Sequence, residues 1–151
     1  MSDRVLTREQ RLPGTPAEAF GFFADALNLE RITPSWLSFH VTTPKPIEMG
    51  AGTLIEYRLR LHGVPVRWLT RIDVWDPPHR FVDRQLRGPY RRWVHEHTFA
   101  ADGPDGTLMR DRVEYSLPLG PLGAIADVVL VRRDLARIFD HRAASVARFI
   151  K

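Results

Sequence analysis

Residues 53–75 read TLIEYRLRLHGVPVRWLTRIDVW, and the alternation within this stretch decides the fold. Apolar and charged side chains alternate on both sides of His62-Gly63, a dipeptide that suits a tight hairpin turn. A period of two sends successive side chains to opposite faces of a strand. The pattern therefore predicts two antiparallel strands, 53–62 and 65–75, each with an apolar inner face and a charged outer face.

The outer face of this hairpin alternates arginines with acids, and the neighbouring strands extend the pattern. Its members are Glu56, Arg58, Arg60, Arg67, Arg71, Asp73, Arg84, Arg92 and Glu96, and the same alternation places Trp75 among them. Charges of mixed sign are typical of a solvated sheet face with weak cross-strand pairs. We therefore expect no nucleic acid partner, because base stacking requires a row of exposed aromatic side chains.

Further strands are expected on both sides of the hairpin, at 4–12, 38–43, 80–87, 91–100 and 107–117. Connections such as Asp76-Pro77-Pro78-His79 are short and rich in proline or glycine. Such short connections favour pairing between consecutive strands. The expected topology is therefore an antiparallel meander. Arg87 and Arg91 flank another of these turns, where they form either an anion clamp or a solvated loop.

Two short helices are expected between the first two strands. Thr15 is a candidate N-cap, Pro16 takes the first helical position, and Glu18 completes a Thr-x-x-Glu capping box. A second helix, at about 28–33, should end before Pro34, since a residue preceding proline is disfavoured in the helical region.

A long amphipathic helix is expected at about 122–150. Helical spacing relates Leu135, Ile138, Phe139, Arg142, Val146 and Phe149, while the first half is apolar on more than one face. That first half and Trp36 either form the mouth of a cavity or belong to an ordinary core.

Length and composition exclude several classes. The chain has 151 residues, 44% hydrophobic and 26% charged, which fits one globular domain spanning 1–151. It has no cysteine, which excludes disulfides, zinc-thiolate sites and iron–sulfur clusters. We expect a cytoplasmic protein without stable membrane insertion, because neither a signal peptide nor a spanning apolar run is visible. The net charge is a mild +4.

Polar groups gather on one half of the inner sheet face. Asp83, Gln85, His95, His97 and Asp111 are all assigned to it by alternation. Burial of ionisable groups is costly unless they are paired or reach water. Two interpretations follow: a ligand pocket with one apolar and one polar half, or a buried Asp–His network that fixes the sheet. For the pocket, we expect Asp111 to be unpaired and to face the ligand.

The expected ligand-binding residues come from the inner face and the long helix. They are Tyr57, Leu59, Trp68, Asp83, Gln85, Trp93, His95, His97, Asp111, Tyr115 and Phe139.

Three kinds of chemistry fit these groups. The pocket binds or transports a ligand passively; or His95 or His97, oriented by Asp83 or Asp111, acts as a general acid or base. The third is a metal held by His95-x-His97 and a carboxylate. Because the wider spacing of known metal sites is missing, we expect neither a metal nor a cofactor. Catalysis by a serine nucleophile is disfavoured, since no Gly-x-Ser-x-Gly elbow is present.

Several motifs resemble the SRPBCC superfamily of START-like, helix-grip proteins, which includes polyketide cyclases and dehydrases. The resemblance spans the chain and is carried by residues 13–20, 34–37, 81–85, 88–99 and 111–123. It implies an α+β helix-grip fold: a curved antiparallel sheet of about seven strands wrapped around a long C-terminal helix. It also implies a cavity between sheet and helix that binds a hydrophobic or amphipathic small molecule, or alternatively a cyclase or dehydratase activity there.

Overall fold

The computed structural model describes residues 4–44, 47–118 and 131–149, in which a seven-stranded antiparallel sheet packs against helices. In chain order the elements are β1 (Arg4–Pro13), α1 (Pro16–Phe23), α2 (Asn28–Ile32), η1 (Ser35–Leu37), β2 (His40–Val41), β3 (Leu54–Leu61), β4 (Val64–Asp76), β5 (Arg80–Arg87), β6 (Arg92–Ala101), β7 (Gly106–Ser116) and α4 (Arg132–Phe149).

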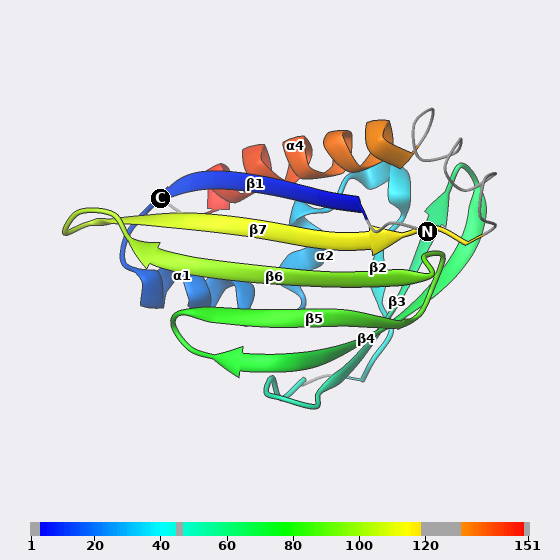
Figure 1. Cartoon of the computed structure of the whole chain (residues 1–151), viewed down its shortest axis with the longest axis horizontal. Coiled ribbons are helices and arrows are strands. Elements are labelled where there is room, and N and C mark those ends of the chain that lie inside the picture. Colours follow the sequence, from blue (N-terminus) through cyan, green and yellow to red (C-terminus); the bar gives the residue numbers. More distant parts are fainter. Residues whose placement is uncertain (1–3, 45–46, 119–130, 150–151) are drawn as a thin grey trace.

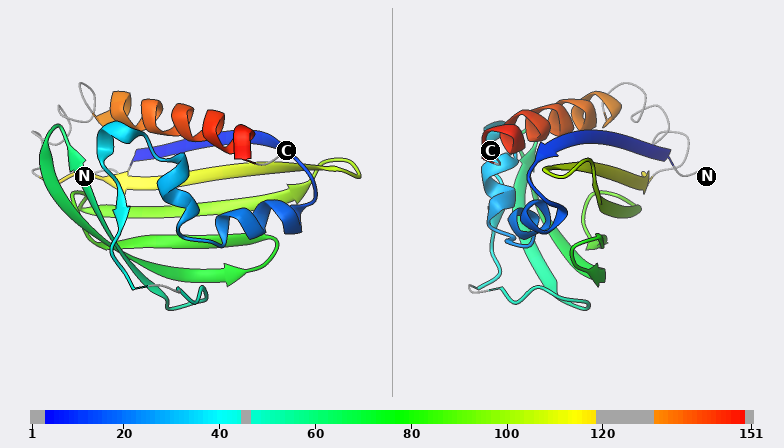
Figure 2. Two further views of the ribbon diagram at one scale, coloured as in Figure 1. Left: turned by 180° about the vertical axis from the view of Figure 1, so that it is seen from behind. Right: turned by 90° about the vertical axis from the view of Figure 1, so that its left-hand side faces the viewer.

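The strand order β1-β7-β6-β5-β4-β3-β2 confirms the predicted meander, because each strand from β2 to β7 lies beside the next in sequence. β1 completes the sheet by pairing with β7, from Arg4 opposite Tyr115 to Pro13 opposite Gly106. The sheet is curved, and the described helices lie on its concave side (Figures 1 and 2). The predicted α+β helix-grip architecture is therefore confirmed.

The start of α1 follows the predicted capping box. The Thr15 hydroxyl accepts a hydrogen bond from the Glu18 amide, and the Glu18 carboxylate accepts one from the Thr15 amide. The helix then buries Phe20 and Phe23 against the sheet. Edge-to-face contacts join Phe20 to Phe81 and Phe99, and aromatic pairs of this kind contribute about 0.5–1.5 kcal/mol beyond their buried area. This aromatic cluster holds the closed end of the fold.

A β-bulge corrects the expected position of Trp75. The pairing of β4 with β5 shifts register between Ile72 and Val74, so the strict alternation ends at Asp73. Trp75 consequently lies opposite Phe81 and packs against it and Phe20, on the inner side of the sheet. The prediction that Trp75 lies on the charged outer face was wrong for this reason.

The strand expected at 38–43 is shorter than predicted. Ser35–Leu37 form a turn of 3₁₀ helix that ends at Ser38, which is left-handed with φ of 47°. The chain therefore joins the sheet only at His40. The first half of the predicted long helix, 122–130, lies outside the described residues, and α4 begins at Arg132. None of the described helices combines the length and the hydropathy needed to cross a membrane.

Candidate functional site

A cavity of about 180 Å³ lies between the concave face of the sheet and the helices. Its described lining is mostly aliphatic and aromatic, with a polar group at one side. The lining residues are Leu29, Ile32, Thr33, Leu37, Phe39, Tyr57, Leu59, Leu61, Trp68, Thr70, Asp83, Tyr90, Trp93, His95, His97, Leu135, Ile138, Phe139 and Arg142. An apolar protein cavity of about 150 Å³ holds benzene. The volume here therefore suits a molecule built on one or two rings.

The polar side of the cavity is assembled from three adjacent strands. In the sheet register, Asp83 of β5 lies opposite His95 of β6, and His97 of β6 lies opposite Asp111 of β7. Each imidazole nevertheless bonds the diagonal carboxylate. His97 Nε2 is 2.7 Å from Asp83 Oδ2, and His95 Nε2 is 2.7 Å from Asp111 Oδ1. The two imidazole rings stack with their centres 3.6 Å apart.

Arg142 of α4 adds a positive charge to these four side chains, with 11% of its side-chain surface exposed. One of its terminal nitrogens lies 3.2 Å from Asp111 Oδ1, and another lies 3.4 Å from His97 Nδ1. Its guanidinium carbon also lies 5.3 Å from the centre of the Phe23 ring, a distance at which a cation–π contact is favourable. Arg142 thus links the long helix to the sheet through charge as well as packing.

Arg142 is a site residue that the sequence analysis missed. It occurs at helical spacing among Leu135, Phe139 and Val146, where periodicity marks only an apolar face. The signal that could have found it is an arginine at a core position, because a fully buried arginine needs an anionic partner.

The charges of the cluster balance. Burial alone would raise the pKa of Asp111, but the Arg142 charge and hydrogen bonds from His95 and His97 hold it well below its usual value. Burial likewise opposes the low pKa of Asp83, yet the His97 hydrogen bond and nearby positive charges keep that pKa lowered. Near neutral pH two carboxylates are therefore ionised.

The two histidines differ in charge. Burial and the charge on His97 lower the pKa of His95 to about 4, so that His95 is neutral near pH 7. Burial also opposes the charged form of His97, but its contacts with Asp111 and Asp83 outweigh burial and raise its pKa above 6.5. At pH values below the raised pKa of His97, His97 and Arg142 therefore balance Asp83 and Asp111.

Asp111 is paired, which corrects the expectation that it is an unpaired residue facing the ligand. Arg142 and both histidines surround it, and it is not among the described residues that line the cavity. Arg142, which contacts Asp111 from α4, itself lines the cavity. Asp111 therefore belongs to the support of the site.

Of the other expected ligand-binding residues, Gln85 and Tyr115 also lie outside the described lining. The Gln85 side-chain amide donates to the Tyr90 carbonyl and accepts from the Tyr90 amide, which closes the turn between β5 and β6. Tyr115 packs edge-to-face against Tyr90, and Tyr90 itself lines the cavity. Both residues thus position Tyr90 in the cavity wall without lining the cavity themselves. The expected residues that the cavity brings together are Tyr57, Leu59, Trp68, Asp83, Trp93, His95, His97 and Phe139.

Trp36 and the arginine pair at 87 and 91 lie outside the described lining as well. Trp36 has 39% of its surface exposed and packs under the Arg137 guanidinium, at 4.8 Å from its ring centre. Arg87 and Arg91 are both exposed.

Hydrogen-bonding capacity remains at the cavity wall. Because His95 donates through Nε2 to Asp111, its Nδ1 is an acceptor, and Asp83 Oδ2 at 3.9 Å lies beyond hydrogen-bonding distance of it. Asp83 is partly exposed, with 18% of its side-chain surface accessible. Burial and the charge on Asp83 raise the pKa of Tyr57, so its hydroxyl keeps its proton. The wall thus offers two acceptors and the Tyr57 donor, beside the Arg142 guanidinium, which lines the cavity and contacts Asp111 and His97.

The side chains of Asp83, His95 and His97 also satisfy the spacing of a metal site, with ligand atoms within 4.8 Å of one another. A divalent cation there would compete with the proton on His97 and with Arg142, which already balance both carboxylates. The charge of the cluster therefore favours a neutral or hydrogen-bonding guest over a metal ion.

A curved sheet that grips a C-terminal helix around an apolar cavity defines a helix-grip, START-like ligand-binding protein. Residues 4–150 match the family described as "Polyketide cyclase / dehydrase and lipid transport", and the chain belongs to that family within the SRPBCC superfamily. Among curated proteins, none matches the sequence.

Solved structures share this fold at low sequence identity. One is the Zhui aromatase/cyclase from Streptomyces sp. R1128, with TM-score 0.70 and 15% identity over 98% of this chain and 96% of that chain. Norcoclaurine synthase from Thalictrum flavum has TM-score 0.71 and 13% identity, covering 98% of this chain and 93% of its own. A protein from Thermus thermophilus has TM-score 0.69 and 20% identity, covering 96% and 92%. These likenesses establish the fold and leave the activity to the site itself.

The opposite pKa shifts of the histidines predict how stability depends on pH. Between pH 6.5 and about 4 the unfolded chain protonates His95 and the folded chain does not, so the free energy of unfolding falls as the pH falls. The contribution of His97 is complete below pH 6.5 and is lost as the pH rises through its raised pKa. Urea unfolding should therefore show a maximum near pH 6.5. A His95→Gln variant should lose part of the acid-side decline; an unchanged acid limb would contradict the assignment of His95.

Proposed function

We propose that this protein binds one compact, mostly apolar ring-bearing molecule in the cavity, and that the polar group of the ligand lies against Asp83 and His95. The observation that supports this most strongly is the composition of the cavity wall. Aliphatic and aromatic side chains surround a single polar corner where hydrogen-bonding atoms remain unused. Such an arrangement buries the apolar part of a ligand and orients it by one polar end.

The polar corner favours a ligand that donates a hydrogen bond. Asp83 is an ionised carboxylate, and Nδ1 of neutral His95 is an acceptor. A hydroxyl or phenol group can donate to either atom, and Tyr57 can donate to the oxygen of that same group. A carboxylate ligand would instead meet the negative charge of Asp83, while the Arg142 guanidinium in the same lining is already paired with Asp111. The supported class is thus a hydroxylated ring system.

This proposal is tested with 2-naphthol and naphthalene, which share two rings and differ by one hydroxyl. Binding is followed through the fluorescence of the protein, since Trp68 and Trp93 line the cavity. We expect one site per chain and an affinity for 2-naphthol about tenfold or more above that for naphthalene. The reason is that a hydrogen bond to a charged group contributes about 1.5–3 kcal/mol. Equal affinities, or no saturable binding of 2-naphthol, would contradict the proposal.

A second candidate, a proton-transfer enzyme of the cyclase or dehydratase kind, is favoured by one specific observation. The imidazolium of His97 is hydrogen-bonded to Asp83, and both side chains line the cavity beside the Tyr57 hydroxyl. A bound hydroxyl or carbonyl could exchange a proton with this pair. In the carrier the bound molecule is released unchanged, whereas in the enzyme it is released with a hydroxyl eliminated or a ring closed. Mass spectrometry of an aryl β-hydroxy ketone after incubation distinguishes the two, because the enzyme would abstract the proton beside the carbonyl and release the β-hydroxyl as water, which lowers the mass by that of one water.

A further inference from the structure

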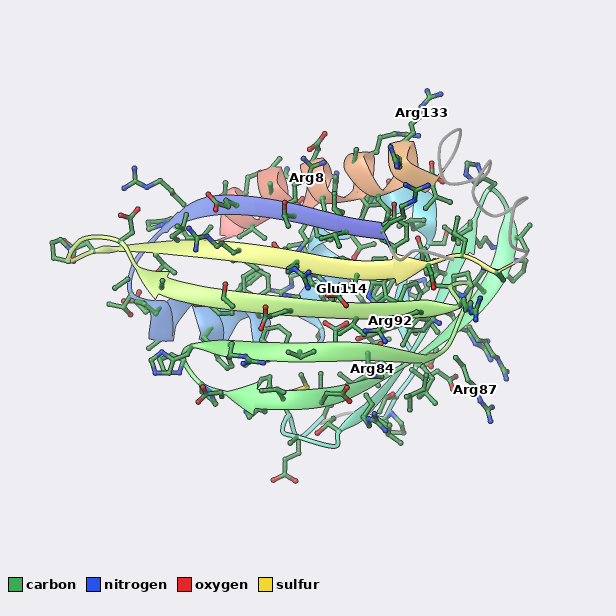
Figure 3. The ribbon with its side chains drawn as sticks, viewed as in Figure 1. Arg8, Arg84, Arg87, Arg92, Glu114 and Arg133 are labelled. Carbon is green, nitrogen blue, oxygen red and sulfur yellow. The ribbon has the colours of Figure 1, made fainter. Side chains whose placement is uncertain are left out.

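The outer face of the sheet divides into two halves that differ in how their charges are matched. Over most of β4 to β7, apart from the end with Arg67 and Arg87, the arginines have carboxylate partners. Asp73 accepts from Arg71 at 2.7 Å and from Arg84 at 2.8 Å, and Glu114 pairs with Arg92 at 3.2 Å. Figure 3 shows Arg84, Arg92 and Glu114 lying over this part of the sheet. This half of the face therefore has the predicted weak ion pairs between neighbouring strands.

The other half, formed by β2, β3 and the adjoining end of β4, presents basic groups without such partners. His40 lies opposite Arg58, and Arg58 lies opposite Arg67, which makes one continuous row across three strands. All three side chains are exposed or partly exposed, and Arg60 and Arg87 beside them are exposed. Within the described part of the chain, no carboxylate forms an ion pair with any of these five basic groups. Glu56, two residues before Arg58, is hydrogen-bonded to the Thr42 hydroxyl.

Directly opposed like charges destabilise a sheet. The neighbouring half of the same face avoids that cost with acids, so the unmatched row is not a general property of this surface. Exposed apolar side chains lie close to it in the chain. Val64, next to the turn between β3 and β4, is 61% exposed, and Leu86, next to Arg87, is 40% exposed. Figure 3 shows Arg87 extending away from the ribbon at this end of the sheet.

We propose that this basic end, made of His40, Arg58, Arg60, Arg67 and Arg87, docks the protein reversibly on an anionic phospholipid surface. The guanidinium groups match the geometry of phosphate oxygens. Leu86 supplies an apolar contact that a headgroup region accepts and that the backbone of a nucleic acid does not. Val64, opposite Leu61, belongs to the inner face of the sheet and is not part of this surface. Among the described residues of β2, β3 and β4, no aromatic side chain is fully exposed for bases to stack on, which disfavours single-stranded nucleic acid.

The position of this surface relative to the cavity gives docking a consequence. Tyr57, Leu59 and Trp68 line the cavity from the same strands that carry Arg58, Arg60 and Arg67 on their opposite face. Docking would therefore place the outer side of this cavity wall on the membrane, with the sheet between the lipid and the cavity. A molecule bound in that cavity rests on the proposed function, whereas docking itself does not.

The test is co-sedimentation with vesicles in about 0.05 M salt, where screening is weak. Vesicles of phosphatidylcholine with about 30% phosphatidylglycerol are compared with vesicles of pure phosphatidylcholine, because only the former carry surface charge. We expect binding to the anionic vesicles alone. Reversal of two charges, Arg58→Glu with Arg67→Glu, should weaken it by about 25-fold or more, since each arginine near such a surface contributes about fivefold.

Two controls make the result specific. Arg60→Glu with Arg87→Glu provides an independent double reversal, in case the first variant fails to fold by circular dichroism. Arg110→Glu reverses a charge at the far end of the same face, where Arg110 pairs with Glu9, and should leave binding unchanged within about twofold. Three results would overturn the proposal: no binding to the anionic vesicles, equal weakening by Arg110→Glu, or displacement of the protein from vesicles by a short DNA duplex at equal phosphate concentration.

Discussion

Replacing Asp111 with asparagine is expected to lower the free energy of unfolding by about 3 kcal/mol or more. The substitution keeps the shape of the side chain and removes its charge. Arg142 and the His97 imidazolium, which contact Asp111 at 3.2 and 3.3 Å, would then lack one of their two carboxylates inside the protein. Removing one charge leaves its partners buried and uncompensated. This loss of stability is larger than the stability that the intact cluster contributes. Urea unfolding at pH 6.5 measures the change.

The matched control is Glu114→Gln on the same strand. Glu114 pairs with Arg92 and Arg112 on the outer face, where solvent screens the charges, so the loss should stay below about 1 kcal/mol. An Asp111→Asn protein as stable as the control variant would show that Asp111 is not a member of a buried charge cluster, contrary to the geometry.

Replacing Leu59 with tryptophan is expected to abolish ligand binding while the protein still folds. Leu59 is 7% exposed and lines the cavity from β3, so the larger indole would occupy much of the 180 Å³ that the ligand needs. The new side chain grows into open space, which limits the overpacking cost to about 1–3 kcal/mol. The affinity for 2-naphthol should fall by more than about tenfold, because the aromatic rings lose the space that buries them.

Leu54→Trp is the matched control for this variant. Leu54 lies on the same strand, with half of its surface exposed opposite Arg71, and does not line the cavity. Its replacement should leave the affinity unchanged. A folded Leu59→Trp protein that binds 2-naphthol as well as the Leu54→Trp protein does would place the ligand elsewhere in the molecule.

Much of the fold could be predicted from the sequence, because local physics determines it. Strand alternation reports which face is buried, and the box from Thr15 to Glu18 reports where a helix begins. Alternation predicted the wrong face for Trp75, because a bulge at Asp73 shifts the alternation by one residue. The local sequence pattern does not mark that bulge. Its cause is tertiary: Asp73 accepts from Arg71 and Arg84 on two strands, while Trp75 packs into the core.

Strand alternation predicted which side chains share the inner face, but neither Arg142 nor the arrangement of the cluster. Alternation places His95, His97 and Asp83 on one inner face, and the cavity does bring these side chains together. The pairing of Asp111 could not be read from the strands, because its partner Arg142 comes from a helix distant in sequence. The diagonal hydrogen bonds follow from the stacking of two imidazoles, which only the three-dimensional arrangement reveals. The residues were therefore identified more reliably than their charges.

The same dependence on geometry explains why the site favours binding by a hydrogen-bond donor. A histidine in isolation titrates near pH 6.5, and either His95 or His97 could have been the base. In the folded protein His97 holds the proton, and His95 stays neutral with Nδ1 as an acceptor. The two neighbours on one strand thus have different roles, one balancing charge and the other available to a ligand.

The most direct test of the central claim is the ¹⁵N chemical shift of His95 Nδ1, followed by NMR at pH 6.5 as 2-naphthol is added. A hydrogen bond accepted from the ligand should move the resonance of this unprotonated nitrogen upfield, with saturation at one ligand per chain. Naphthalene should leave it nearly in place. The His97 nitrogens should remain those of an imidazolium throughout. If saturating 2-naphthol leaves His95 Nδ1 unmoved, the ligand does not lie at the polar corner and the account is contradicted.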